Sequence, residues 1–164
     1  WILSKSELEF SDRMQLQLPE SSAEGDVDGS SLFGLAGGCC FDFSPHETHL
    51  FLVGTEEGKI HKCSKAYNTE YLETYEGHTM AVYTVRWSEF NEKVFISCSA
   101  DWSIKLWDHE RKEALFSFDL DNQVGDVAWA PWSSTTFAAC TADGKVHVYD
   151  LNENPHEPVC EQKV

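Results

Sequence analysis

This chain of 164 residues contains a few histidines, cysteines and acidic residues that could bind a metal or take part in catalysis. His46 and His49 imitate a zinc motif, but two residues separate them where the helical motif of zinc proteases has three. The segment also follows Pro45 and precedes an apolar run that is typical of a strand, not of a helix. We therefore interpret it as an exposed turn and expect no metal site there.

The other reactive groups give no better site. Cys39 and Cys40 are adjacent, and adjacent strand residues point to opposite faces, so the two cannot easily hold one ion. The glycine-rich stretch 34–38 lacks the Lys-Ser/Thr pair of a phosphate-binding loop. His78 and Asp101 suggest a proton relay, but no nucleophile stands in a suitable context. The sequence predicts no catalytic residue, no metal and no cofactor, and therefore not an enzyme.

Acidic residues outnumber basic ones by 28 to 12, which gives a formal net charge of -16. Such a chain repels nucleic-acid phosphates and anionic lipid, so we expect neither nucleic acid nor membrane as a partner. No apolar run approaches the roughly 20 residues of a membrane helix, which predicts a soluble protein. The apolar fraction of 41% and the aromatic fraction of 13% predict a folded, β-rich chain.

The six cysteines are scattered and lack the regular spacing of a disulfide scaffold, which favours a reduced, cytosolic compartment. Cys98 and Cys140 align with Gly54 when the chain is laid over itself. The shared position therefore requires a small residue, and we interpret these two cysteines as packing residues.

The self-alignment reveals three repeats of one pattern. Alternating apolar runs end at Phe43, Trp87 and Trp129, which are 44 and 42 residues apart, close to the period of a propeller blade. Each unit then shows three more short alternating stretches separated by Gly, Asp, Asn or Pro turns, as in a four-stranded blade. A tight turn in each unit carries an acid at the same spacing, at Glu57, Asp101 and Asp143.

The middle repeat carries the residue pattern of a WD repeat: a Gly-His pair ending at His78, hydroxyls in the second strand, Asp101 in the turn, and a Trp-Asp pair beginning at Trp107. A buried imidazole, hydroxyl, acid and indole can hydrogen bond in series across neighbouring strands and fix one blade geometry. We assign this network to His78, Asp101, Trp107 and either Ser97 or Ser99. The first and third repeats are degenerate and replace Trp-Asp by Cys-Ser and Tyr-Asp.

The predicted fold is all-β: a partial WD-repeat β-propeller with about three four-stranded blades and part of a preceding blade. Three blades and a fraction cannot close a ring of about four to eight, so we expect a fragment of a larger propeller with further blades in a longer polypeptide. The expected units are the end of a preceding blade and an outer strand at 1–18, an inserted acidic and glycine-rich loop at 19–38, and blade repeats at 39–79, 80–123 and 124–164.

Three segments, beginning at Phe51, Val94 and Val124, resemble consecutive blades of dynein intermediate chains. The motifs GTEEGKI at 54–60 and DWSIKLW at 101–107 are more distinctive than a generic Trp-Asp repeat. Within the family, the stretch KCSKAYNTEYL and the ending KLWDH resemble the axonemal outer-arm type more than the cytoplasmic type.

This resemblance implies a scaffold whose propeller binds the tail of a dynein heavy chain beside a second intermediate chain, in the axoneme of a cilium or flagellum. Light-chain contacts lie in regions of the family outside this segment, and the acidic surface favours indirect contact with microtubules. The alternative is a general WD-repeat adaptor that recognises a peptide or a modified protein tail. Generic adaptors lack the GTEEGKI and KCSKAY stretches.

We expect partner-binding residues at one rim, where the turn between the second and third strands and the loop entering the first strand emerge. Trp102 leads this set, because the other two repeats have glycine there and a bulky aromatic at a turn can anchor a partner. It could equally pack on its own neighbouring blade. Trp132, after Pro131, is a candidate on the opposite rim. The residues expected on the first rim are Glu56, Met80, Tyr83, Trp102 and Asp126.

Overall fold

A computed structural model describes residues 36–67 and 70–164 of the chain. These residues form β-strands, turns and loops, and none of their segments is a helix that could cross a membrane. The unit predicted at 1–18 and nearly all of the loop predicted at 19–38 lie outside the described residues.

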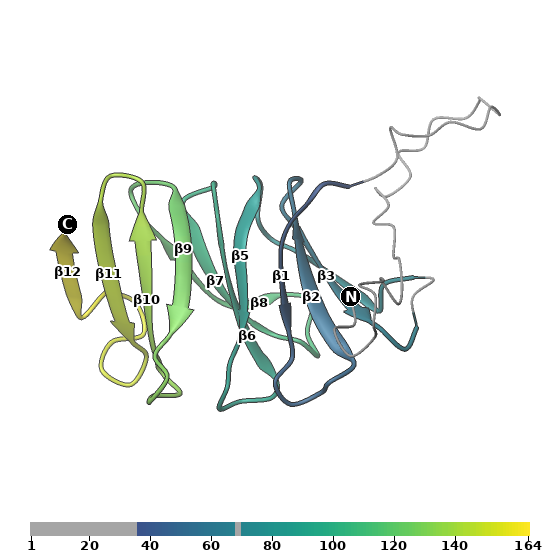
Figure 1. The fold of residues 1–164 in the computed structure, drawn as a ribbon. Coiled ribbons are helices and arrows are strands. Elements are labelled where there is room, and N and C mark those ends of the chain that lie inside the picture. Colours follow the sequence, from purple (N-terminus) through teal and green to yellow (C-terminus); the bar gives the residue numbers. More distant parts are fainter. Residues whose placement is uncertain (1–35, 68–69) are drawn as a thin grey trace, which may run out of the picture.

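The described strands form three antiparallel sheets of four strands, each in chain order (Figure 1). Blade 1 contains β1 (Gly38–Phe43), β2 (Leu50–Thr55), β3 (Lys59–Ser64) and β4 (Glu73–Glu76). Blade 2 contains β5 (Val82–Trp87), β6 (Val94–Ser99), β7 (Ser103–Asp108) and β8 (Ala114–Asp119). Blade 3 contains β9 (Val124–Trp129), β10 (Thr136–Thr141), β11 (Lys145–Asp150) and β12 (Cys160–Lys163).

The first strands of the three sheets, β1, β5 and β9, lie side by side, and the later strands of each sheet lie further out (Figure 1). The sheets therefore fan out as neighbouring blades of a β-propeller do. The all-β prediction of a partial β-propeller is confirmed.

The apolar core is divided into two layers, one between each pair of neighbouring blades. The layer between blades 1 and 2 includes Leu52, Ile60 and Val85, and the layer between blades 2 and 3 includes Ile96 and Val127. Each sheet thus buries its apolar side chains against the next sheet, where burial stabilises the fold by about 25 cal/mol per Å². A blade depends on its neighbour for this burial.

Polar groups also join the blades. The Asp42 carboxylate accepts a hydrogen bond of 2.8 Å from the Trp87 backbone N–H. In blade 2, the His109 carbonyl accepts hydrogen bonds from the Tyr75 hydroxyl at 2.8 Å and from the Lys62 ammonium at 3.0 Å, both in blade 1. These contacts join backbone groups of one blade to side chains of another, and so they fix how the blades sit against each other.

Gly54 lies at a tightly packed point of the contact between blades 1 and 2. A Cβ at this position would be 2.6 Å from the Cys40 sulfur and 2.8 Å from a methyl carbon of Val82. Cys98, at the aligned position of blade 2, is fully buried, whereas Cys140 of blade 3 is exposed. Close packing between blades 1 and 2 thus explains why the position in blade 1 has no side chain.

We predict that Gly54→Ala lowers the free energy of unfolding by about 1–3 kcal/mol, the usual cost of overpacking a core. The matched control is Gly125→Ala, because a Cβ there would meet no heavy atom closer than 3.9 Å. The control should leave stability nearly unchanged. Denaturant unfolding of the purified variants compares the two, and equal midpoints would contradict this account of the blade interface.

Candidate functional site

A chain of hydrogen bonds crosses blade 2 from its third strand to the loop that enters its first strand. The Trp107 indole N–H donates to the Ser97 hydroxyl oxygen at 2.8 Å. Ser97 and Nε2 of His78 are also 2.8 Å apart, and Nδ1 of His78 lies 3.0 Å from an Asp101 carboxylate oxygen. The structure thus brings four residues of the middle repeat together.

When the His78 imidazole is neutral, the two ends of this series determine the direction of its hydrogen bonds. The indole N–H of Trp107 can only donate, and the ionised carboxylate of Asp101 can only accept. We therefore infer that the Ser97 hydroxyl donates to Nε2 of His78 and that His78 carries its proton on Nδ1, toward Asp101. Every polar group in the series then has a partner, as a buried network requires.

Asp101 is the point where the network meets the backbone. Its carboxylate accepts hydrogen bonds from the backbone N–H groups of Thr79 and Ser103, each at 3.0 Å, and from the Ser103 hydroxyl at 2.6 Å. Burial alone would raise the pKa of Asp101, but hydrogen bonds from His78, Ser103 and Thr79 outweigh burial and hold that pKa well below its usual value. The carboxylate thus ties the loop entering β5 to the start of β7.

Of the two serines proposed for the network, Ser97 bonds to His78 and Ser99 does not. Ser99 instead donates its hydroxyl to the Met80 carbonyl at 3.0 Å and accepts the backbone N–H of Asp101 at 3.2 Å. Ser103 was not among the predicted residues, although its hydroxyl contacts both Asp101 and His78. The short pattern Asp-x-Ser in a tight turn was the available signal for it.

The third repeat replaces this polar chain by apolar contacts. Leu120 and Ala139, which align with His78 and Ser97, are buried hydrophobic residues. The aromatic pair persists: Tyr149 stacks on Phe137 at 4.9 Å between ring centroids, as Trp107 stacks on Phe95 at 5.9 Å in blade 2. The stacked pair is thus common to both blades, whereas the polar network belongs to blade 2.

The turns between second and third strands, together with the loops entering β5 and β9, form one edge of the blades, at the top of Figure 1; we call it the upper rim. In these turns Gly58 and Gly144 have positive φ angles of 86° and 79°. Trp102 occupies the same place in blade 2 with a φ of 71°. A left-handed backbone at a bulky residue costs roughly 1–2 kcal/mol, so this turn is strained where its counterparts are relaxed.

The residues expected on this rim differ in how they are held. Glu56 and Met80 lie in upper-rim segments and are exposed. Tyr83 lies in β5 at a β-bulge, an extra residue in the ladder to β6, and is also exposed. Asp126 is not in a turn: it lies within β9, and its carboxylate accepts the Thr84 hydroxyl of blade 2 at 2.9 Å. Asp126 therefore joins two blades.

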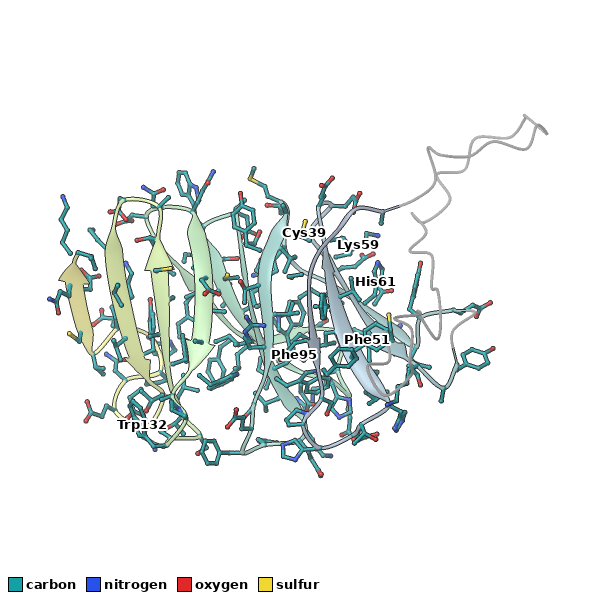
Figure 2. The ribbon with its side chains drawn as sticks, in the orientation of Figure 1. Cys39, Phe51, Lys59, His61, Phe95 and Trp132 are labelled. Atoms are coloured by element: carbon teal, nitrogen blue, oxygen red, sulfur yellow. The ribbon has the colours of Figure 1, made fainter. Side chains whose placement is uncertain are left out.

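Trp132 lies at the opposite edge, the lower rim, in the turn between β9 and β10 (Figure 2). It is 80% exposed. Phe90 holds the same place in the turn of blade 2 and is 51% exposed, a second exposed ring that the sequence reasoning did not single out. The repeat period that aligns Phe90 with Trp132 was the signal that could have found it.

His46 and His49, the pair resembling a zinc motif, have separate partners. Nε2 of His46 lies 3.3 Å from the Ser88 carbonyl of the next blade, and Nε2 of His49 lies 3.5 Å from the Glu47 carboxylate. Both residues are exposed in the turn between β1 and β2. In this arrangement His46 contributes to the contact between two blades.

Comparison with known proteins gives matches along the whole chain. A family model described as "WD domain, G-beta repeat" matches residues 69–108 and 114–150, and each match contains the last strand of one blade and the first three strands of the next. The chain is 60% identical to the ciliary dynein intermediate chain 2 of Heliocidaris crassispina and 51% identical to dynein axonemal intermediate chain 1 of Bos taurus. It is 44% identical to the 78 kDa intermediate chain of the flagellar outer arm of Chlamydomonas reinhardtii.

All three matches cover 100% of this chain. The chain spans 23% of the length of the first two relatives and 25% of the third, about a quarter of each. The predicted resemblance to axonemal dynein intermediate chains is confirmed.

We predict that Ser97→Ala lowers the free energy of unfolding by about 1–3 kcal/mol, because it leaves the buried Trp107 N–H without an acceptor and His78 without a donor. Ser117→Ala, at an exposed serine of β8, is the control and should change stability by less than about 0.5 kcal/mol. Thermal unfolding of both variants is the measurement. Two unchanged midpoints would mean that the network does not stabilise blade 2.

The lowered pKa of Asp101 predicts a pH dependence of stability. Its ionised form contributes stability above the pKa of an unfolded aspartate, about 3.9, and this contribution is lost as the pH falls further toward the folded pKa. Asp101→Asn should therefore unfold at a lower temperature than the parent protein at neutral pH, and the gap should narrow below about pH 4. Melting curves across this range measure the gap, and a constant gap would contradict the prediction.

Proposed function

This chain is a relative of the axonemal dynein intermediate chains, and from that premise we propose that it belongs to a non-catalytic scaffold subunit of an axonemal outer-arm dynein. The observation that carries the proposal is similarity along the whole chain, including 44% identity to an intermediate chain named for the flagellar outer arm. The names of the relatives, ciliary, axonemal and flagellar, indicate the axoneme of a cilium or flagellum as its location.

We propose that the propeller binds the tail of a dynein heavy chain, so that the subunit helps to assemble the motor and supports ciliary motility. Fanned sheets whose faces are sealed against each other present their rims as contact surface, and the two rims carry exposed aromatic side chains. Such side chains are the usual anchors of protein interfaces. A second intermediate chain would lie beside this one, and light chains would bind regions outside this segment.

The reactive side chains of blade 2 hydrogen bond to each other, which supports a scaffold role and not an enzyme. His78 and Asp101 form the pair that most resembles a proton relay, but the other nitrogen of His78 leads to Ser97 and Trp107 in the blade interior. The Ser97 hydroxyl is fully buried and therefore cannot reach a substrate. The same side chains that could do chemistry hold the blade together.

The net charge of -16 bears on the remaining partners. A surface with this charge opposes direct binding to the acidic tails of tubulin and to nucleic acid or anionic membrane. Microtubule contact would accordingly be indirect, through the motor that the scaffold helps to assemble.

Affinity capture of the tagged full-length protein from ciliary extract tests this function. The proposal expects recovery of an outer-arm heavy chain together with a second intermediate chain. Recovery of ubiquitin-ligase or histone-binding proteins without a heavy chain would instead support a general WD-repeat adaptor and overturn the proposal. Capture with an unrelated tagged protein of similar net charge serves as the control for charge-driven background.

A further inference from the structure

The five segments of the upper rim contain acids and no lysine or arginine. They are the turns 56–58, 100–102 and 142–144 and the loops 77–81 and 120–123, and all of their residues are described. Two lysines next to these turns are already paired: Lys59 with Glu76 at 2.7 Å, and Lys145 with Asp143 at 3.7 Å. The acids of these segments are Glu56, Glu57, Asp101, Asp121 and Asp143.

Three exposed apolar side chains lie in this acidic rim or in the strand that follows one of its loops. Met80, Tyr83 and Trp102 are 49%, 42% and 52% exposed. Their segments are in contact: the Ala100 N–H in the turn of Trp102 donates to the Ala81 carbonyl beside Met80 at 3.0 Å. A Cβ on Gly58 would be 2.5 Å from the His78 carbonyl, so the turn of blade 1 reaches the same loop. Acids and apolar groups thus share one surface across blades 1 and 2.

Two of these exposed side chains stand at irregular points of the backbone. Trp102 has a φ of 71°, and the other two turns have glycine at this position. Tyr83 is the extra residue of the bulge in β5, and its side chain is exposed between the buried Val82 and Thr84. Glycine would adopt this left-handed backbone without strain, so fold stability does not explain a tryptophan here. A strained, exposed aromatic residue instead indicates a role in binding.

We propose that the upper rim of blades 1 and 2 binds a basic segment of the heavy-chain tail, with an apolar side chain of that segment packed against Met80, Tyr83 and Trp102. This inference rests on the proposed function and adds the surface and the chemistry of the contact. Lysines or arginines of the segment pair with Glu56, Glu57 and Asp121, which have no ion pair within the described part of the chain. An acidic segment would meet only like charges here.

The first test separates folding from binding at one residue. Trp102→Gly removes the anchor and relieves the left-handed strain, so the full-length protein should melt a few degrees higher. Its affinity for the immobilised recombinant tail of an outer-arm heavy chain should fall about tenfold or more. Trp132→Ala, at the opposite rim, is the matched control and should bind like the parent protein.

The second test reverses charge at the same surface. Glu56→Lys combined with Glu57→Lys should weaken binding of the heavy-chain tail and reduce its sensitivity to salt. Glu89→Lys combined with Glu92→Lys changes the net charge equally but alters the lower rim, in the turn between β5 and β6. This control should keep the parent affinity.

The outcomes are distinct. Selective loss of binding in the upper-rim variants, with folding retained, supports the inference. If the parent protein binds the tail and neither Trp102→Gly nor the upper charge reversal weakens it relative to the controls, the inference is wrong and the proposed function stands. If the parent protein does not bind the tail, both are overturned.

Discussion

The arrangement of the upper rim depends on the carboxylate of Asp101. It accepts hydrogen bonds from the imidazole of His78, from the Thr79 N–H and from Ser103, and so it joins the loop entering β5 to the start of β7. That loop continues into Met80, and the adjoining turn carries Trp102. One ionised, largely buried group thus sets the relative positions of two exposed side chains that we propose bind a partner. The same carboxylate ends the series that begins at the Trp107 indole.

Blade 2 can have a polar network where blade 3 has apolar contacts, because the contacts between blades differ from the contacts within each blade. Between blades, stability comes from apolar faces that cover each other and from side chains such as Asp42 that bind the neighbouring backbone. Within blade 2, the network adds directional bonds that fix the loop and the turn. In blade 3 the buried Leu120 fills the place of the imidazole.

The repeat period predicted the propeller and its strands because the alternation of apolar residues and the turn residues are local sequence patterns. The strands and turns of the structure follow these patterns. The repeat period could not separate Ser97 from Ser99, since both lie on the same face of β6 and only the folded structure shows which hydroxyl meets His78. The bulges were equally hidden: Tyr83 is the extra residue in β5 and is exposed, whereas Asp126, beside the equivalent bulge in β9, bonds to Thr84. Glycine at two aligned turns indicated the unusual backbone of Trp102, which the structure shows as a positive φ.

The central claim is that rigid blades present the upper rim to the tail of a dynein heavy chain. Hydrogen–deuterium exchange of the full-length protein, with and without that tail, tests this most directly. The account predicts slower exchange on binding at residues 77–83 and 100–103, with the lower-rim turns unchanged. Slower exchange confined to the turns at 88–93 and 130–135, or no change anywhere in the three blades, would contradict it.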